Sequence, residues 1–167
     1  MFRKSSSAPQ YDLYSSTGKM LSGKSLNLYE DDYGRHKLFF KQVTGRIDES
    51  IFKPLFTSST GSPHAPIRIM IAMMVLKEAQ GYSDAKLFED CRFTILTRSA
   101  LGLVNINDSL PAESTYYLFR KLVANHAQST GENLFDQLFT QMSKDQRVAF
   151  EIRGSRIRMD SKLLSSN

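Results

Sequence analysis

A single acidic residue near the end of the chain has the setting of a catalytic ligand. The segment "RIRMDSKLLSSN", residues 156–167, alternates in a way that predicts a β-strand. Asp160 falls on the charged face of that strand, and Arg156 and Arg158, which are candidate DNA contacts, lie on the same face. One carboxylate on a terminal strand is typical of the first part of an acidic active site. The alternative is an exposed strand aspartate without a catalytic role.

A second group of residues has the chemistry of a DNA contact. Residues 81–122 contain short predicted helices, a turn and a basic, aromatic final helix, which together have the outline of a helix-turn-helix unit. A recognition helix needs small polar groups at its N-terminus for base edges and cations for phosphates. Those roles would fall to Ser114, Thr115, Tyr117, Arg120 and Lys121. The alternative, a helical bundle that exposes these side chains, stays open because the turn is long.

Further basic residues alternate with aromatic ones between residues 35 and 56. Arg35, Lys37 and Lys41 would contact DNA, whereas Phe39 and Phe40 are more consistent with core packing. Other chemistry has little support in the sequence. The three histidines show no metal-ligand spacing, and Cys91 lies inside a predicted helix, as a small core residue would.

Composition narrows the class of protein. The 167 residues carry 22 basic and 17 acidic side chains, a net charge of +5, which favours a polyanionic partner. One cysteine excludes an internal disulfide, and neither a secretory signal nor a membrane-spanning run is present. We expect a cytoplasmic, nucleoid-associated protein without a membrane partner.

The predicted elements are mainly helical. We expect a serine-rich segment over 1–30 that is either a flexible arm or loosely docked, a compact multi-helix domain over 31–153, and the strand over 154–167. Helices are predicted over 67–80, 83–91, 93–101 and 114–125. The first of these is apolar nearly all round, and Ser83 would cap the second. A capping box at 129–132 predicts the start of the last helix, with a break near 143. Two buried stripes are expected, one of Leu118, Phe119, Leu122 and Val123, the other of Leu134, Phe135, Leu138, Phe139 and Met142.

Several separate stretches, in order, resemble one family. "YDLYSSTGKMLSGKSLNLYEDD", "APIRIMIAMMVLKEAQGYSDAKLFEDCRFTILTRSALGL", "PAESTYYLFRKL" and "RIRMDSKLLSSN" are similar to bacterial insertion-sequence transposases of the DDE type. The resemblance implies a helical N-terminal domain that holds the transposon end, followed by the first strand of an RNase H-like catalytic domain. It also implies that Asp160 is the first of three carboxylates that hold two Mg²⁺ ions for phosphoryl transfer.

The resemblance and the end of the chain together set the functional expectation. Nothing after Asn167 supplies the second aspartate, the glutamate or the remaining strands. We therefore expect an N-terminal transposase fragment that binds double-stranded transposon-end DNA. It should hold only an incomplete metal site at Asp160, need no Mg²⁺ itself, and neither cut nor join DNA alone. The alternatives are a helical self-assembly module that forms a homodimer, and a truncated regulator of transposition.

Overall fold

The computed structural model describes residues 15–56 and 66–149, which are almost entirely helical. Ten helical segments follow one another in these described residues: α1 Thr17–Met20, α2 Gly23–Glu30, α3 Arg35–Gln42, the 3₁₀ segments η1 Thr44–Arg46 and η2 Glu49–Leu55, α4 Ile67–Gln80, α5 Asp84–Phe93, α6 Ile95–Ala100, α7 Glu113–Thr130 and α8 Leu134–Ala149. Within the described residues, extended pairing is limited to one isolated bridge between Ser16 and Asn105. The mainly α class is thus confirmed. The predicted terminal strand lies outside the described residues.

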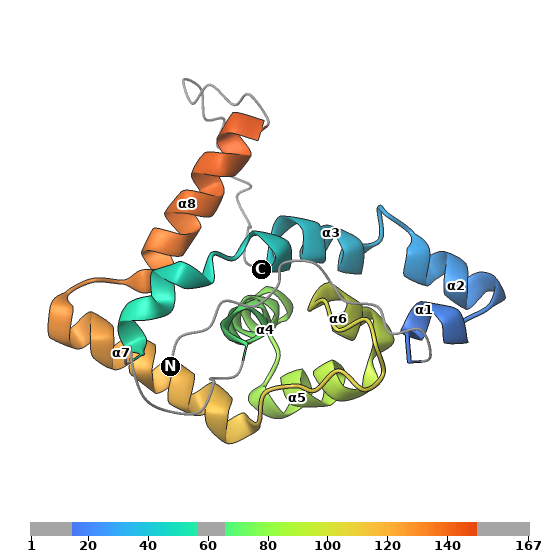
Figure 1. Cartoon of the computed structure of the whole chain (residues 1–167), viewed down its shortest axis with the longest axis horizontal. Helices are drawn as coiled ribbons and strands as arrows, with labels where there is room; N and C mark the ends of the chain where they lie inside the picture. Colours follow the sequence, from blue (N-terminus) through green and yellow to red (C-terminus); the bar gives the residue numbers. More distant parts are fainter. Residues whose placement is uncertain (1–14, 57–65, 150–167) are drawn as a thin grey trace, which may run out of the picture.

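Helix α4 is the centre of the fold (Figure 1). Its residues are apolar nearly all round, and seven of them are buried. Such a helix is stable only when other elements surround it. Figure 1 shows α3, α5, α6 and α7 arranged around α4, which is seen nearly end-on. The bounds predicted from the apolar run, 67–80, are those of the structure.

The N-terminus of α4 is satisfied by a side chain from elsewhere in the chain. Its cap residue is Pro66, which provides no side-chain hydrogen bond. Instead, the Oε1 atom of Glu49, in η2, accepts a hydrogen bond of 2.9 Å from the backbone N–H of Arg68. Glu49 is 0% exposed. A carboxylate at this position satisfies a free N–H group and interacts favourably with the positive end of the helix dipole.

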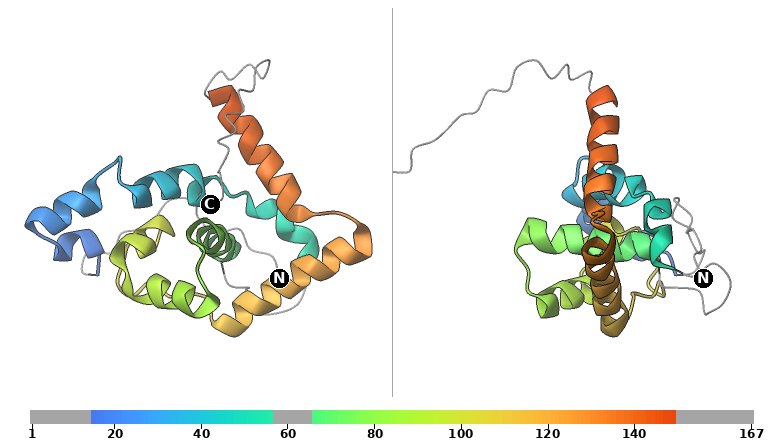
Figure 2. Two further views of the ribbon diagram at one scale, coloured as in Figure 1. Left: turned by 180° about the vertical axis from the view of Figure 1, so that it is seen from behind. Right: turned by 90° about the vertical axis from the view of Figure 1, so that its left-hand side faces the viewer.

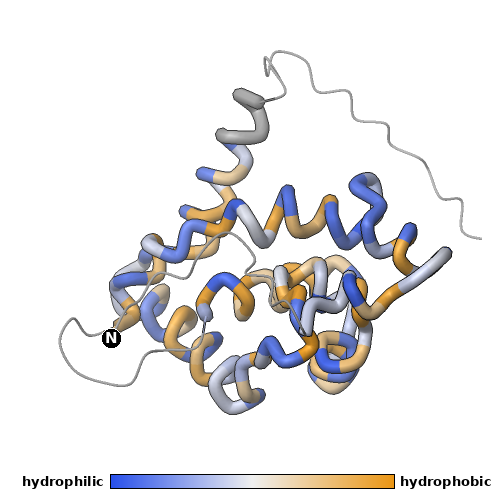
Figure 3. Tube along the Cα trace, turned by 45° about the vertical axis from the view of Figure 1, so that its right-hand side comes forward, coloured by the Kyte–Doolittle hydropathy of each residue, from blue (hydrophilic) through white to orange (hydrophobic). Residues whose placement is uncertain are grey.

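The outer helices each bury one side, as the alternation of hydrophobic and hydrophilic residues along them suggests (Figure 3). In α7 the buried residues are Tyr116, Phe119 and Val123. The prediction that Leu118 is buried is wrong, because its side chain is 57% exposed. Tyr116, one helical turn before Phe119, takes the inner position instead. It packs edge-on against Phe88, with 5.4 Å between ring centroids.

Helix α8 begins differently from the prediction and then projects from the body (Figure 2). The capping box at 129–132 does not form, because α7 continues through Thr130 and ends at Gly131 with φ +75°. The side chain of Asn133 caps α8 instead, accepting from the N–H of Phe135 at 3.0 Å. The helix runs without the expected break at 143. Leu134, Leu138 and Met142 are buried, whereas Phe139 is 43% exposed.

Residues 15–30 form structure where the composition predicts an arm. They fold into α1 and α2, and the segment before α1 pairs with a distant loop. The N–H of Thr17 donates to the carbonyl of Val104 (2.9 Å), and the N–H of Ile106 donates to the carbonyl of Ser15 (2.8 Å). Arg98 holds that loop through its guanidinium, which donates to the carbonyls of residues 105, 106 and 108. This serine-rich segment is ordered by backbone hydrogen bonds together with the burial of Tyr29, which is 4% exposed.

The contact between Glu49 and α4 gives a stability prediction. We expect Glu49→Ala to lower the free energy of unfolding by about 2–3 kcal/mol, because it leaves a buried N–H group without that acceptor. Glu49→Gln, which keeps an acceptor oxygen, should lose less. Urea denaturation measures both, and Glu78→Ala, an exposed position on α4, is the control. A Glu49→Ala loss no larger than that of the control would contradict this role.

Candidate nucleic-acid interface

The predicted recognition helix lies at the surface, with its first turn exposed. Ser114 is exposed and Thr115 half-buried, at the start of α7. The neighbouring Glu113 forms an ion pair of 3.0 Å with Arg92 of α5. Twelve residues, 101–112, separate α6 from α7. This connection is much longer than the 3–4-residue turn of a helix-turn-helix motif.

Two of the predicted DNA contacts on α7 are already engaged within the protein. Asp84, the first residue of α5, accepts a hydrogen bond from the hydroxyl of Tyr117 (3.2 Å) and lies 3.7 Å from the guanidinium of Arg120. Lys77 of α4 completes the group, with its Nζ atom 2.7 Å from Oδ1 of Asp84. We refer to these four residues as the Asp84 junction. Lys121 is exposed and has no ion-pair partner among the described residues.

The electrostatics of the Asp84 junction follow from these distances. The hydrogen bond from Lys77, supported by Tyr117 and Arg120, holds the pKa of Asp84 below its ordinary value. Partial burial and the adjacent negative charge raise the pKa of Tyr117. The carboxylate therefore stays ionised at neutral pH, and it offsets part of the positive charge that α7 would offer to phosphates.

The basic residues of α3 are free of such partners. Arg35, Lys37 and Lys41 form no ion pair within the part of the chain that the structure describes. At about 100° per residue, Lys37 and Lys41 lie on one side of the helix, within about 40° of each other, whereas Arg35 lies about 120° from Lys41. We call Lys37 and Lys41 the lysine pair.

The lysine pair lies beside an exposed aromatic side chain. Both lysines line a groove of about 520 Å³, together with Asp32, Tyr33, Leu38 and Phe40. Tyr33 is 87% exposed. The Nζ atom of Lys37 also lies 5.2 Å from the ring centroid of Tyr29, close enough for a cation–π contact. Cations next to an exposed ring are a combination found where proteins bind nucleic-acid strands.

The aromatic residues of α3 are partly buried, in agreement with their predicted core role. Phe39 packs against the main hydrophobic core. Phe40 lies against Gly102, where an added Cβ atom would come within 2.9 Å of the phenyl ring. Because Gly102 also has φ +81°, a larger residue there would be strained as well as crowded.

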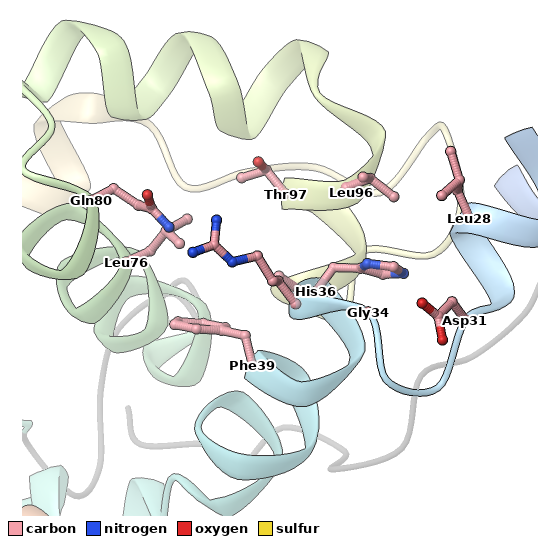
Figure 4. Close-up of a pocket in the computed structure, with 11 residues that line it drawn as sticks. Leu28, Asp31, Gly34, His36, Phe39, Leu76, Gln80, Leu96 and Thr97 are labelled. Carbon is pink, nitrogen blue, oxygen red and sulfur yellow. The ribbon is translucent and has the colours of Figure 1, made fainter.

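Arg35 lies at a different cavity, the α3 hollow, which has a volume of about 310 Å³ (Figure 4). Apolar side chains from four helices line it, with polar groups among them. The lining residues are Leu28, Asp31, Gly34, Arg35, His36, Phe39, Leu76, Gln80, Leu96, Thr97 and Ala100. The Nε2–H group of His36 donates to the carbonyl of Tyr29 (2.8 Å), so that ring has a structural partner. Sequence reasoning did not identify Gln80 or Thr97, because no local pattern links α4 to α6.

The structure thus separates the predicted DNA contacts. Figure 1 shows α3 and α7 well apart, with α4 between them. The lysine pair, Arg35 and the α7 residues form three groups rather than one surface. Sequence reasoning also missed Lys77 and Asp84. The only local signal at Asp84 was its position after the cap residue Ser83, whose hydroxyl accepts from the N–H of Lys86 (3.2 Å), as predicted.

The remaining candidates fall into two groups. Asp160, Arg156 and Arg158 lie outside the described residues, as does the Mg²⁺ site that the first of these would help to form.

Cys91 is buried, and burial raises the pKa of its thiol to about 12, which fits its predicted core role. Within residues 15–56 and 66–149, no three histidine, cysteine or acidic side chains are grouped to hold a metal ion. None of the described helices is long and apolar enough to cross a membrane.

The Asp84 junction gives a pH-dependent prediction. Because the pKa of Asp84 is lowered in the folded protein, its contribution to stability is present above its ordinary pKa and is lost as the pH falls through the lowered value. We expect Asp84→Asn to cost about 1 kcal/mol or less at pH 7, a value typical of partly exposed ion pairs, and almost nothing near pH 2. Urea denaturation of both proteins at pH 7, 5, 3 and 2 tests this. Asp32→Asn, at an exposed carboxylate without such partners, is the control.

Comparison with known proteins identifies the family. A family model described as a transposase domain (DUF772) matches residues 28–122, more than half of the chain. That range includes α3, the α3 hollow, the Asp84 junction and the first part of α7. No curated protein and no solved structure matches the chain. On the strength of the family model, the chain belongs to the transposase domain family DUF772.

Proposed function

We propose that this protein binds double-stranded DNA in transposition, with the lysine pair of α3 as its main contact to the phosphate backbone. The observation that carries the proposal is the distribution of unpaired charge. Lys37 and Lys41 have no acidic partner among the described residues, whereas Arg120 lies beside Asp84. A phosphate therefore gains more at α3, where the two lysines form no ion pair with a described residue, although the carboxylate of Asp32 lines the same groove.

The finer assignment rests on the resemblance described above. We propose that the DNA is the end of an insertion sequence whose transposase is of the DDE type. In this proposal the helical domain holds the DNA end, and the three catalytic carboxylates, of which Asp160 would be the first, lie outside that domain. Ser114 and Thr115, at the exposed start of α7, remain the candidates for contacts to base edges. In this proposal the lysine pair provides affinity and α7 provides sequence preference.

The salt dependence of binding tests the phosphate contacts. We expect the double variant Lys37→Gln/Lys41→Gln to lose about tenfold or more in affinity for a 30-base-pair duplex at low salt. The slope of log affinity against log salt should become shallower by about 2, because two phosphate contacts are lost. Fluorescence anisotropy at rising salt concentration measures both quantities.

Two controls make the result specific. Lys86→Gln removes a lysine that already pairs with Glu89 and Asp90 and should change little. Lys121→Gln tests the rival surface on α7. A larger loss for Lys121→Gln than for the double variant would move the interface to α7, and no binding of the wild type at low salt would contradict DNA binding altogether.

A second candidate function is self-assembly, which one apolar groove favours. The groove, of about 590 Å³, lies between α4, α7 and α8, and its lining includes Met74, Val75, Phe135 and the exposed Phe139. Exposed apolar grooves of this kind are common at protein–protein contacts.

The oligomeric state tests this second function. We expect light scattering after size exclusion to find a dimer for the wild type and a monomer for Phe139→Asp. Leu118→Asp, an exposed apolar position on α7 that does not line the groove, should stay dimeric. A monomeric wild type at micromolar concentration would exclude this function.

A further inference from the structure

We propose that the α3 hollow binds one unpaired nucleotide, with the base among its apolar side chains and the phosphate at Arg35. The inference rests on the proposed DNA-binding function and adds a second, chemically different site to it. The lysine pair would contact the backbone of any duplex. The hollow would distinguish DNA that has an unpaired nucleotide from DNA that does not.

The walls of the hollow suit a planar base. Leu28, Leu76 and Leu96 give the hollow apolar sides, and Phe39 adds an aromatic ring (Figure 4). A planar base gains by leaving water for such surroundings. The volume of about 310 Å³ is at the lower end of the range of small-molecule sites, which suits one nucleotide rather than a helix of a partner protein.

The hollow also contains polar side chains that have no partner among the described residues. The side chains of Arg35, Gln80 and Thr97 all line the hollow, yet none of them forms a hydrogen bond or ion pair with another described residue. They come from α3, α4 and α6, so the tertiary structure alone brings them together. A glutamine amide and a threonine hydroxyl supply donors and acceptors for the edge of a base, and a guanidinium suits a phosphate.

The carboxylate of Asp31 adds a constraint on the orientation of the nucleotide. Asp31 also lines the hollow, and its Oδ1 atom accepts a hydrogen bond from the N–H of Tyr33 (3.0 Å). A phosphate next to this carboxylate would be repelled, whereas an exocyclic amino group could donate to it. The phosphate therefore belongs at Arg35, and a base with an amino group is favoured.

The hollow lies within reach of a DNA strand that the lysine pair holds. Arg35 lies at one edge of the exposed side of α3, and Lys37 and Lys41 lie towards the other edge. A helix is about 10 Å across, so a DNA strand with a rise of about 3.4 Å per nucleotide crosses α3 in about three nucleotides. A strand held by the lysine pair can thus deliver its terminal nucleotide to the hollow.

Fluorescence anisotropy with two matched DNA ligands tests the proposal on the full chain. One ligand is a blunt 20-base-pair duplex, and the other is the same duplex with one unpaired deoxyadenosine at an end. We expect the wild type to prefer the second by about 5- to 20-fold, the effect of one added base contact. In Leu96→Trp, which fills the hollow, that preference should fall to about onefold while affinity for the blunt duplex stays unchanged.

Two further variants, a folding check and a competition experiment distinguish the possible results. Leu118→Trp introduces the same residue on α7, away from the hollow, and should keep the preference. Gln80→Leu, at an exposed position, should reduce the preference even if Leu96→Trp fails to fold, and thermal melting checks the folding of every variant. Competition by millimolar deoxyadenosine monophosphate that removes the preference would support a site for a free nucleotide, whereas a preference that resists it would support a site that needs the strand.

The outcomes distinguish this inference from the function on which it rests. Equal binding of both ligands by the wild type, or a preference that persists in Leu96→Trp and Gln80→Leu, would overturn the nucleotide site and leave DNA binding intact. A failure of the wild type to bind either ligand at low salt would overturn both.

Discussion

Residues 67–76 of helix α4 have no exposed face, and this constraint determines the arrangement of the other elements. These residues are all buried or half-buried, so other elements must cover them, and the terminal backbone groups of the helix must be satisfied as well. The buried carboxylate of Glu49 meets the second requirement at the N-terminus, through the N–H of Arg68. At the other end Gly81, with φ +65°, closes the helix. The core of the protein is therefore organised around one helix whose two ends are fixed.

The position of α4 has consequences for the charged surface. Because α3 and α7 cover different sides of α4, their basic residues cannot form a single surface (Figure 1). Lys77, near the end of α4, meets Asp84 at the start of α5 and extends the ion-pair group to α7. Charge on α7 is thus partly neutralised as part of the packing of three helices. The lysines of α3 form no ion pair with another described residue, and for this reason the proposed phosphate contacts are assigned to α3.

The comparison between prediction and structure is clearest for individual helices. The bounds of α4, the Ser83 cap of α5 and the core role of Cys91 all follow from local signals: an apolar run, a hydroxyl before a helix and a small residue on a buried side. The predicted start of α8 is wrong because two candidate cap residues, Ser129 and Asn133, lie close together in the sequence. Gly131 ended α7 in the left-handed conformation, and Asn133 rather than Ser129 provided the acceptor. The predicted burial of Leu118 is wrong because Tyr116, one helical turn before Phe119, occupies the buried side of α7.

By itself, the sequence determined the helical class, the central apolar helix with both of its ends, and the cap of α5. These features depend on neighbours within a few positions of the chain, where hydrophobic periodicity and capping act. Only the tertiary structure decided which cations are free and which are paired, because Asp84 and Arg120 are 36 positions apart. It also decided that Arg35, Gln80 and Thr97, from three separate helices, line one cavity. Such groupings arise from helix packing around α4, and no local pattern in the sequence encodes them.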